Sequence, residues 1–185
     1  RGLAVVAGFN ISNTVANLFN VVFIALGSAI SIIVGQQLGA GKLEEAVDTD
    51  RKMIVFSVFC CFVIGACMFA IAPFFPRIYN TKEEVRGLAK QFIRIASACM
   101  PLYGFMHATY FTLRSGGRTV ITFLFDSVYI WVVDIPLAFV LTRFTGVPIV
   151  SIYLSCQLIE IIKCIIGYVM VKKKIWVNNM VMEQQ

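Results

Sequence analysis

The chain has 185 residues, of which 59% are hydrophobic and 14% are charged, and its mean hydropathy is +0.83. Because soluble domains carry about 25% charged residues, this composition excludes a soluble globular domain and indicates a polytopic membrane protein. The net charge of +6 does not indicate nucleic-acid binding, since the basic residues cluster in short loops and near the C-terminus, where they set orientation and attract anionic lipid.

Five apolar segments are long enough to cross a bilayer as helices. A hydrocarbon core of about 30 Å needs roughly 20 helical residues, and lipid offers no hydrogen-bond partner to an open backbone. The sequence therefore predicts an all-α membrane protein, with a helix bundle over residues 1–171 and a short cytoplasmic tail over residues 172–185. The predicted helices are residues 5–34, 53–72, 92–113, 120–141 and 148–171.

The first predicted helix carries a row of asparagines whose spacing places them on one face. They are Asn10, Asn13, Asn17 and Asn20. Carboxamides on one face commonly bond neighbouring transmembrane helices. The same face could instead line a substrate or ion pathway, and the spacing does not distinguish these two interpretations.

A glycine-rich turn from Gly35 to Gly41 follows the first helix, and six charged residues lie between positions 42 and 51. A phosphate-binding loop needs a glycine five residues before the Gly–Lys pair and a serine or threonine after it. Gln36 and Leu43 occupy those positions. The segment is therefore predicted to be a turn at the membrane surface, with its charges in water.

Prolines and one capping pattern mark the next two helices. Pro73 and Pro76 end the second helix, and Thr81–Glu84 predicts a capping box at the start of the third. Pro101 lies in the middle of the third helix and predicts a kink there. His107 lies in the same region, where it either bonds a neighbouring helix or carries a proton.

The last two predicted helices hold four ionisable groups within the hydrocarbon. They are Asp126, Asp134, Glu160 and Lys163. A charged aspartate there costs about 3 kcal/mol on insertion scales, so each group needs a partner or a role in transport. Arg114 or Arg118 could pair with Asp126. Lys163 follows Glu160 by three residues, which allows an ion pair on one helix surface.

No pattern of catalytic or metal-binding residues is readable. The six cysteines lie inside apolar runs without metal-like spacing, and a single histidine cannot build a histidine-based zinc site. We therefore expect a protein that is not an enzyme and that has no metal or cofactor.

The distribution of Lys and Arg predicts the orientation in the cell membrane. Eight lie on the side that holds the glycine-rich turn and the C-terminus, and six lie on the opposite side. Because positive charge is enriched in cytoplasmic loops, we expect the turn and the C-terminus to be cytoplasmic.

Several motifs resemble the multidrug and toxic compound extrusion (MATE) transporters. The turn from Gly35 to Gly41 is similar to the family's Gly-Gln-x-Leu-Gly-Ala-Gly turn, and Arg114–Gly117 is similar to its Arg-x-x-Gly turn. Asp126, Trp131 and Pro136 follow in the family's order.

This resemblance implies a twelve-helix exporter with two six-helix lobes, of which the chain would be the C-terminal lobe without its first helix. Its partners would be that helix, the N-terminal lobe, the lipid bilayer and a small-molecule substrate, often an organic cation. The exchanged ion would be a proton or sodium. Many members place coupling acids on the seventh and tenth helices, but the tenth-like segment, residues 92–113, has no acid, so that site does not transfer.

Two other functions compete with drug export. A flippase for lipid-linked oligosaccharides, from the same superfamily, would need basic residues in its cleft to hold diphosphate, and only Arg94 and Lys163 lie inside predicted helices. A membrane anchor subunit that does not transport would need only satisfied ion pairs.

Overall fold

A computed structural model describes residues 2–117 and 119–177, without the side chains of Thr119 and Phe125. Four long helices dominate it. They are α1 (Leu3–Gly39), α2 (Leu43–Ile71), α3 (Glu83–Ser115) and α6 (Ile149–Lys172). A short 3₁₀ helix, η1 (Phe75–Ile78), connects α2 to α3. Four shorter pieces connect α3 to α6, namely α4 (Thr119–Phe123), η2 (Leu124–Val128), η3 (Ile130–Asp134) and α5 (Ile135–Phe144).

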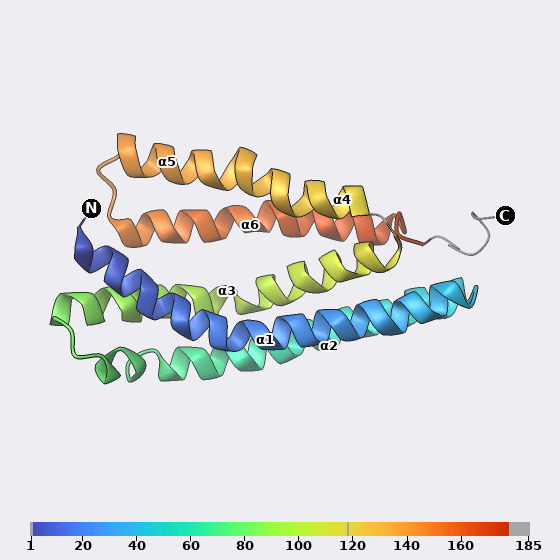
Figure 1. Ribbon diagram of the computed structural model, residues 1–185, viewed down its shortest axis with the longest axis horizontal. Coiled ribbons are helices and arrows are strands. Elements are labelled where there is room, and N and C mark those ends of the chain that lie inside the picture. Colours follow the sequence, from blue (N-terminus) through green and yellow to red (C-terminus); the bar gives the residue numbers. More distant parts are fainter. Residues whose placement is uncertain (1, 118, 178–185) are drawn as a thin grey trace.

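The long helices run side by side along the longest axis of the molecule (Figure 1). The helix α3 lies between α1 and α2 on one side and α6 on the other, and it contacts all three. The α1–α2 turn and the end of α6 lie at the same end of the bundle, opposite the α5–α6 connection. This arrangement fits helices that cross a bilayer in alternating directions.

Four stretches of the described residues are long and apolar enough to cross a membrane: α1, α2, residues 120–144 and α6. These agree with four of the five predicted crossings. The helix α3 is 33 residues long but is not among them. Its position explains its lower apolarity, because a helix packed against three others exposes less surface to lipid.

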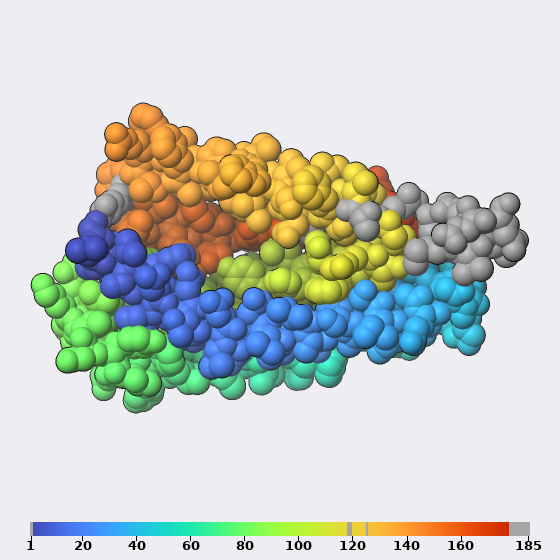
Figure 2. All heavy atoms as spheres, in the orientation of Figure 1, coloured from blue at the N-terminus to red at the C-terminus, as the bar shows by residue number. Residues whose placement is uncertain are grey.

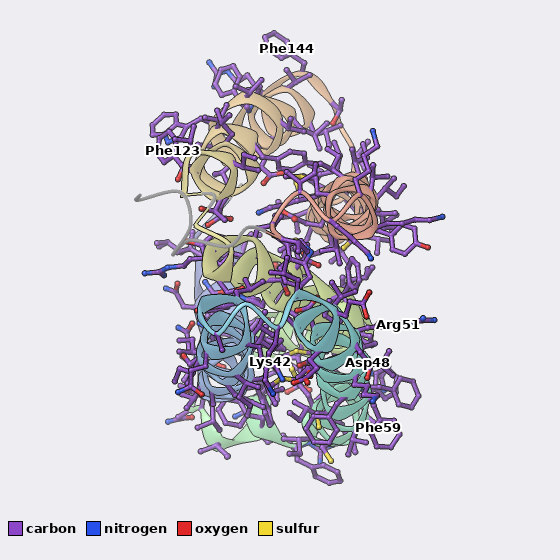
Figure 3. All side chains as sticks on the ribbon, turned by 90° about the vertical axis from the view of Figure 1, so that its right-hand side faces the viewer. Lys42, Asp48, Arg51, Phe59, Phe123 and Phe144 are labelled. Atoms are coloured by element: carbon purple, nitrogen blue, oxygen red, sulfur yellow. The ribbon has the colours of Figure 1, made fainter. Side chains whose placement is uncertain are left out.

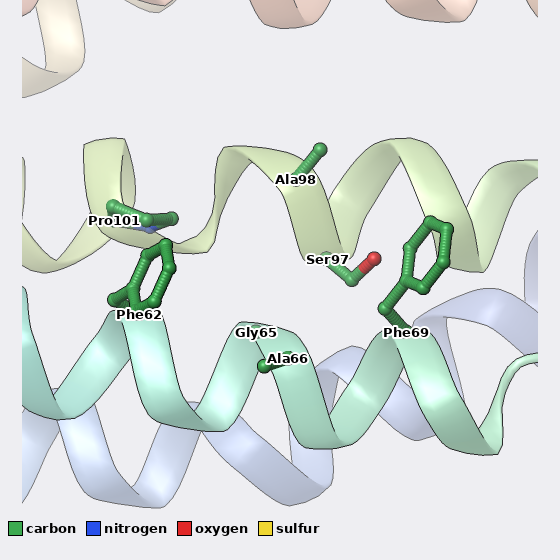
Figure 4. Close-up of a pocket in the computed structure, with 7 residues that line it drawn as sticks. All are labelled: Phe62, Gly65, Ala66, Phe69, Ser97, Ala98 and Pro101. Atoms are coloured by element: carbon green, nitrogen blue, oxygen red, sulfur yellow. The ribbon is translucent and has the colours of Figure 1, made fainter.

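The helices α2 and α3 approach closely where Pro101 interrupts the bonding of α3. Proline has no N–H, so the Ser97 carbonyl receives no helical hydrogen bond from residue 101. Gly65 of α2 lies against that carbonyl, so closely that a Cβ at Gly65 would be 2.6 Å from the Ser97 oxygen. Figure 4 shows Phe62 and Phe69 on either side of this crossing. The predicted kink region is therefore also a place where α2 packs closely against the backbone of α3.

Two predicted helix starts differ from the structure. The helix α2 begins at Leu43 instead of residue 53, because the charged residues after the turn form its first turns. The capping box predicted at Thr81–Glu84 is wrong: Lys82 is the N-cap of α3 and no side chain caps the helix. The Thr81 hydroxyl is buried without a hydrogen-bond partner among the described residues, so it does not reach the amide that it was expected to bind.

The predicted solvated position of the acids after the turn is wrong for one of them. Asp50 is 1% exposed and accepts a hydrogen bond from the Thr112 hydroxyl of α3, at 2.5 Å. The neighbouring charges are exposed, as Lys52 and Asp48 show by pairing at the surface. Asp50 thus fixes the start of α2 to the end of α3.

The fourth predicted helix is not a continuous α-helix. Between α4 and α5 the chain forms two π-helical stretches, η2 and η3, whose wider turns close one residue later than α-helical turns. Asp126 lies in η2 and Asp134 lies in η3. Both acids of this segment therefore lie where the helix is widened, a feature frequent at functional sites.

The helix bundle extends beyond the predicted boundary at residue 171. Lys174 has a φ of 53°, and the turn there folds the chain back, so that Trp176 becomes 1% exposed among Ile30, Val34 and other core residues. Gly116 makes room, because a Cβ there would lie 2.0 Å from the Trp176 carbonyl oxygen. Residues 172–177 thus belong to the bundle, while the rest of the predicted tail lies outside the described residues.

Candidate functional site

Three of the four asparagines of α1 line a cavity of about 280 Å³ between α1, α3 and α6. They are Asn13, Asn17 and Asn20. Figure 2 shows a hollow between α1 and α6, with α3 at its base. Asn10 is exposed and does not line the cavity, and its backbone carbonyl accepts a hydrogen bond from the Thr14 hydroxyl. Three of the four asparagines on this face of α1 therefore line a cavity.

The opposite walls of this cavity supply aromatic and polar groups from α3 and α6. His107 stacks on Phe23 of α1, with ring centroids 5.3 Å apart and an interplanar angle of 4°. The Tyr103 hydroxyl donates to the Gln157 side-chain oxygen of α6. The cavity thus combines flat rings with amide and hydroxyl groups, which is a lining suited to an amphipathic organic molecule.

Lys163 pairs with an acid on a different helix. Its ammonium lies 2.7 Å from Asp126 Oδ1, and the Lys163 side chain is 3% exposed while that of Asp126 is 50% exposed. The ammonium also lies 5.7 Å from the centre of the Tyr129 ring. Sequence spacing proposed Glu160 as the partner of Lys163, and a basic residue of the α3–α4 turn as the partner of Asp126. The structure brings Lys163 and Asp126 together instead, and Arg118 lies outside the described residues.

Asp134 of η3 and Glu160 of α6 are neighbouring acids. Asp134 Oδ1 and Glu160 Oε2 are buried and have no donor among the residues that the structure describes. Two neighbouring carboxylates repel each other, and burial disfavours their charged forms, so uptake of one proton stabilises such a pair. This pair is therefore a place where a proton can be held.

The cavity and the acids are connected through α6. Gln157, which lines the cavity, precedes Glu160 by three residues and lies about 4.5 Å from it along the helix axis. His107 reaches the cavity from α3. All the candidate residues except Asn10 thus belong either to the cavity lining or to the two neighbouring pairs, Asp126–Lys163 and Asp134–Glu160.

Sequence reasoning missed several members of this site. Tyr103 and Gln157 join α3 to α6, and Tyr129 donates to the Ile159 carbonyl at 2.8 Å. A signal existed for Gln157, because its spacing from Glu160 places both on one face of α6. No local signal identified the tyrosines, which resemble ordinary packing residues in an apolar helix.

Comparison with known proteins agrees with the helical membrane fold. The family model described as MatE matches residues 2–140. The chain is 23% identical over 153 residues to the "Probable multidrug resistance protein YoeA" of Bacillus subtilis, covering 80% of this chain and 32% of that protein. It is 25% identical over 138 residues to the "Probable multidrug resistance protein NorM" of Oceanobacillus iheyensis, covering 71% of this chain and 29% of that protein.

The chain thus spans about a third of the length of these curated relatives. No solved structure matches it at a significant level. Because the family model covers more than half of the residues, and the matched region holds apolar helices long enough to cross a membrane, the chain belongs to the MatE family of multi-pass membrane proteins.

Proposed function

We propose that this chain is part of one lobe of an exporter that exchanges organic compounds, often cations, for a proton or sodium. The observation that carries this proposal is the asparagine-lined cavity beside the Asp134–Glu160 pair. It places a lining suited to substrate within one helical turn of a site that can hold a proton. Under this proposal, the substrate site and the proton site of an antiport mechanism would be adjacent.

Electrostatic coupling between the two parts gives a mechanism. Releasing the proton shared by Asp134 and Glu160 adds one negative charge beside the cavity, which favours binding of a cationic substrate. By thermodynamic reciprocity, bound cation favours release of the proton to the same extent. Alternating access of the two lobes would then carry proton and substrate in opposite directions. The Asp126–Lys163 pair keeps its charges balanced during this exchange.

The cavity lining favours organic cations over a lipid diphosphate. Among the described residues that line the cavity there is no lysine or arginine, whereas a flippase for lipid-linked oligosaccharides would need cations to hold its diphosphate. Stacking of a cation on Tyr103 or Tyr153, both of which line the cavity, supplies cation–π attraction.

The substrate part of the proposal is tested by two asparagine variants of the complete transporter, expressed in cells that lack their own drug pumps. Asn17→Ala removes a cavity amide, and losing one hydrogen bond of about 1 kcal/mol should weaken apparent substrate affinity about fivefold. Asn10→Ala is the matched control, since it lies on the same helix outside the cavity lining. Equal effects of the two variants on efflux of a fluorescent cation would contradict the assignment.

The coupling part is tested in membrane vesicles with an imposed proton or sodium gradient. Glu160→Gln should abolish gradient-driven drug accumulation while leaving drug binding measurable, because the amide cannot release a proton. Glu44→Gln, an exposed acid of the first turn of α2, is the control. Full accumulation by Glu160→Gln would remove this pair from the mechanism, and dependence on sodium alone would exclude proton exchange.

The orientation is part of the same proposal. Ala40→Cys, in the α1–α2 turn of a protein whose six native cysteines are replaced by alanine, should react in intact cells only with a membrane-permeant maleimide. Labelling by an impermeant maleimide would place this end of the bundle outside the cytoplasm.

A further inference from the structure

A second pocket lies at the opposite side of α3 from the asparagine-lined cavity, near the end of the bundle that holds the α1–α2 turn. It has a volume of about 440 Å³ and lies between the start of α2, the end of α6 and the turn that follows α6. Ile54, Phe105 and Val171 supply apolar walls. Neither the exchange mechanism nor the family comparison uses this pocket.

Three exposed cations surround the pocket. Arg51 lies in the third turn of α2, Lys172 is the last residue of α6, and Lys174 lies in the turn that follows α6. Figure 3 shows Arg51 at the outer edge of α2, and it belongs to the pocket lining. The Lys172 ammonium lies 5.8 Å from the centre of the Tyr168 ring, which holds it at the rim. Cations from two distant parts of the sequence thus gather around one opening.

The pocket also contains a buried donor without a partner. Trp176 is 1% exposed, and its indole N–H has no acceptor among the described residues. Leaving such a donor unbonded costs free energy, and the Trp176 side chain belongs to the pocket lining, where its fluorescence can report a bound molecule. The φ of 53° at Lys174 and the space left by Gly116 hold Trp176 in this position.

One acid lines the pocket as well. Asp50 is 1% exposed, and its Oδ1 accepts the Thr112 hydroxyl at 2.5 Å. This carboxylate opposes an anion, but the three cations outnumber it. The lining therefore has net positive charge at its rim and apolar side chains in its wall. These two parts complement the anionic headgroup and the apolar acyl chains of an anionic phospholipid.

We propose that this pocket binds an anionic phospholipid, with its phosphate among Arg51, Lys172 and Lys174 and the start of an acyl chain against the apolar wall. The position supports this occupant, because charged residues resume in α2 and α6 at this level, as they do where a helix leaves the hydrocarbon. Basic pockets between transmembrane helices bind lipid headgroups by the same attraction, and tryptophan is favoured at that depth.

Trp176 provides a direct readout in the complete transporter, with every other tryptophan replaced by phenylalanine. In phosphatidylcholine nanodiscs, phosphatidylglycerol with brominated acyl chains should quench Trp176 fluorescence at lower mole fraction than brominated phosphatidylcholine does. Each cation replaced by glutamine should weaken the phosphatidylglycerol effect about fivefold, since a basic residue near the surface contributes about this factor. Lys42→Gln and Lys52→Gln, at the same end but paired with Glu45 and Asp48, should leave it unchanged.

Native mass spectrometry of the unmodified transporter gives a second measurement that needs no variant. After purification from an equimolar mixture of the two lipids, phosphatidylglycerol should be the lipid retained. Equal quenching by both brominated lipids, or equal retention of both, would overturn the proposal. Quenching that persists when Arg51, Lys172 and Lys174 are all replaced would overturn it too. None of these readouts depends on transport, so their failure is distinguishable from failure of the export mechanism.

Discussion

Replacing Gly65 with alanine tests a close approach between α2 and the backbone of α3. The added Cβ would lie 2.6 Å from the Ser97 carbonyl oxygen and 3.0 Å from the Met100 Cβ, whereas ordinary contact begins at 3.4 Å. The Ser97 oxygen belongs to the backbone and cannot rotate away. The two helices must therefore move apart by most of an ångström, or α3 must bend further at Pro101.

The expected cost follows from two opposing contributions. Overpacking of this kind costs about 1–3 kcal/mol, while alanine in a helix interior regains about 0.5–1 kcal/mol relative to glycine. The net loss of about 1–2 kcal/mol corresponds to a factor of about 5–30 in the ratio of folded to unfolded protein.

Denaturant unfolding in detergent measures this change, and Gly35→Ala is the matched control. Both glycines lie inside helices, but a Cβ at Gly35 meets nothing within 4 Å, so this variant should be about 0.5–1 kcal/mol more stable than the parent protein. If Gly65→Ala proved as stable as Gly35→Ala, the close contact would not exist in the folded protein.

Three further substitutions give expected outcomes in the same unfolding assay. Gly116→Ala places a Cβ 2.0 Å from the Trp176 carbonyl oxygen, so it should destabilise the protein by about 1–3 kcal/mol and shift Trp176 fluorescence toward longer wavelength; an unchanged spectrum would contradict this. Thr112→Val removes the donor to buried Asp50 and should cost about 1.5–3 kcal/mol, as for hydrogen bonds to charged groups, whereas Thr112→Ser should recover most of the stability. Gly41→Ala should cost about 1–2 kcal/mol because Gly41 has a φ of 74°, and a neutral result would mean that the turn adopts another backbone conformation.

The helices could be predicted from the sequence because the length of an apolar segment does not depend on how the chain folds. Apolar length identifies a membrane crossing wherever it lies in the chain, and four of the predicted crossings meet that criterion in the structure. The row of asparagines was also visible, since a helix converts fixed spacing into a shared face. Whether that face lines a cavity depends on α3 and α6, which sequence spacing alone does not position.

The errors arose where a residue's surroundings come from a distant part of the chain. Asp50 lies in a run of charges and so suggested a solvated surface, but Thr112, 62 residues away in sequence, buries it. Lys163 has an acid three residues before it, yet its ammonium contacts Asp126 on another element. Spacing rules detect partners on the same helix, whereas partners on different helices can be identified only once the packing of the helices is known. The π-helical turns around Asp126 likewise carry no local signal.

In the proposed exporter, the two faces of α3 would have separate roles in stability and in transport. Ser97, Pro101 and Gly104 follow one another at intervals of four and three residues and face α2, where a Cβ at Gly104 would lie 2.6 Å from the Cys61 sulfur. Tyr103 and His107 lie on the other side and face the cavity. One helix therefore combines a tightly packed face, which cannot move without cost, with a face that lines the proposed substrate cavity. Changes at the α2–α3 contact should accordingly alter unfolding with little effect on efflux per folded molecule, and changes in the cavity should do the reverse.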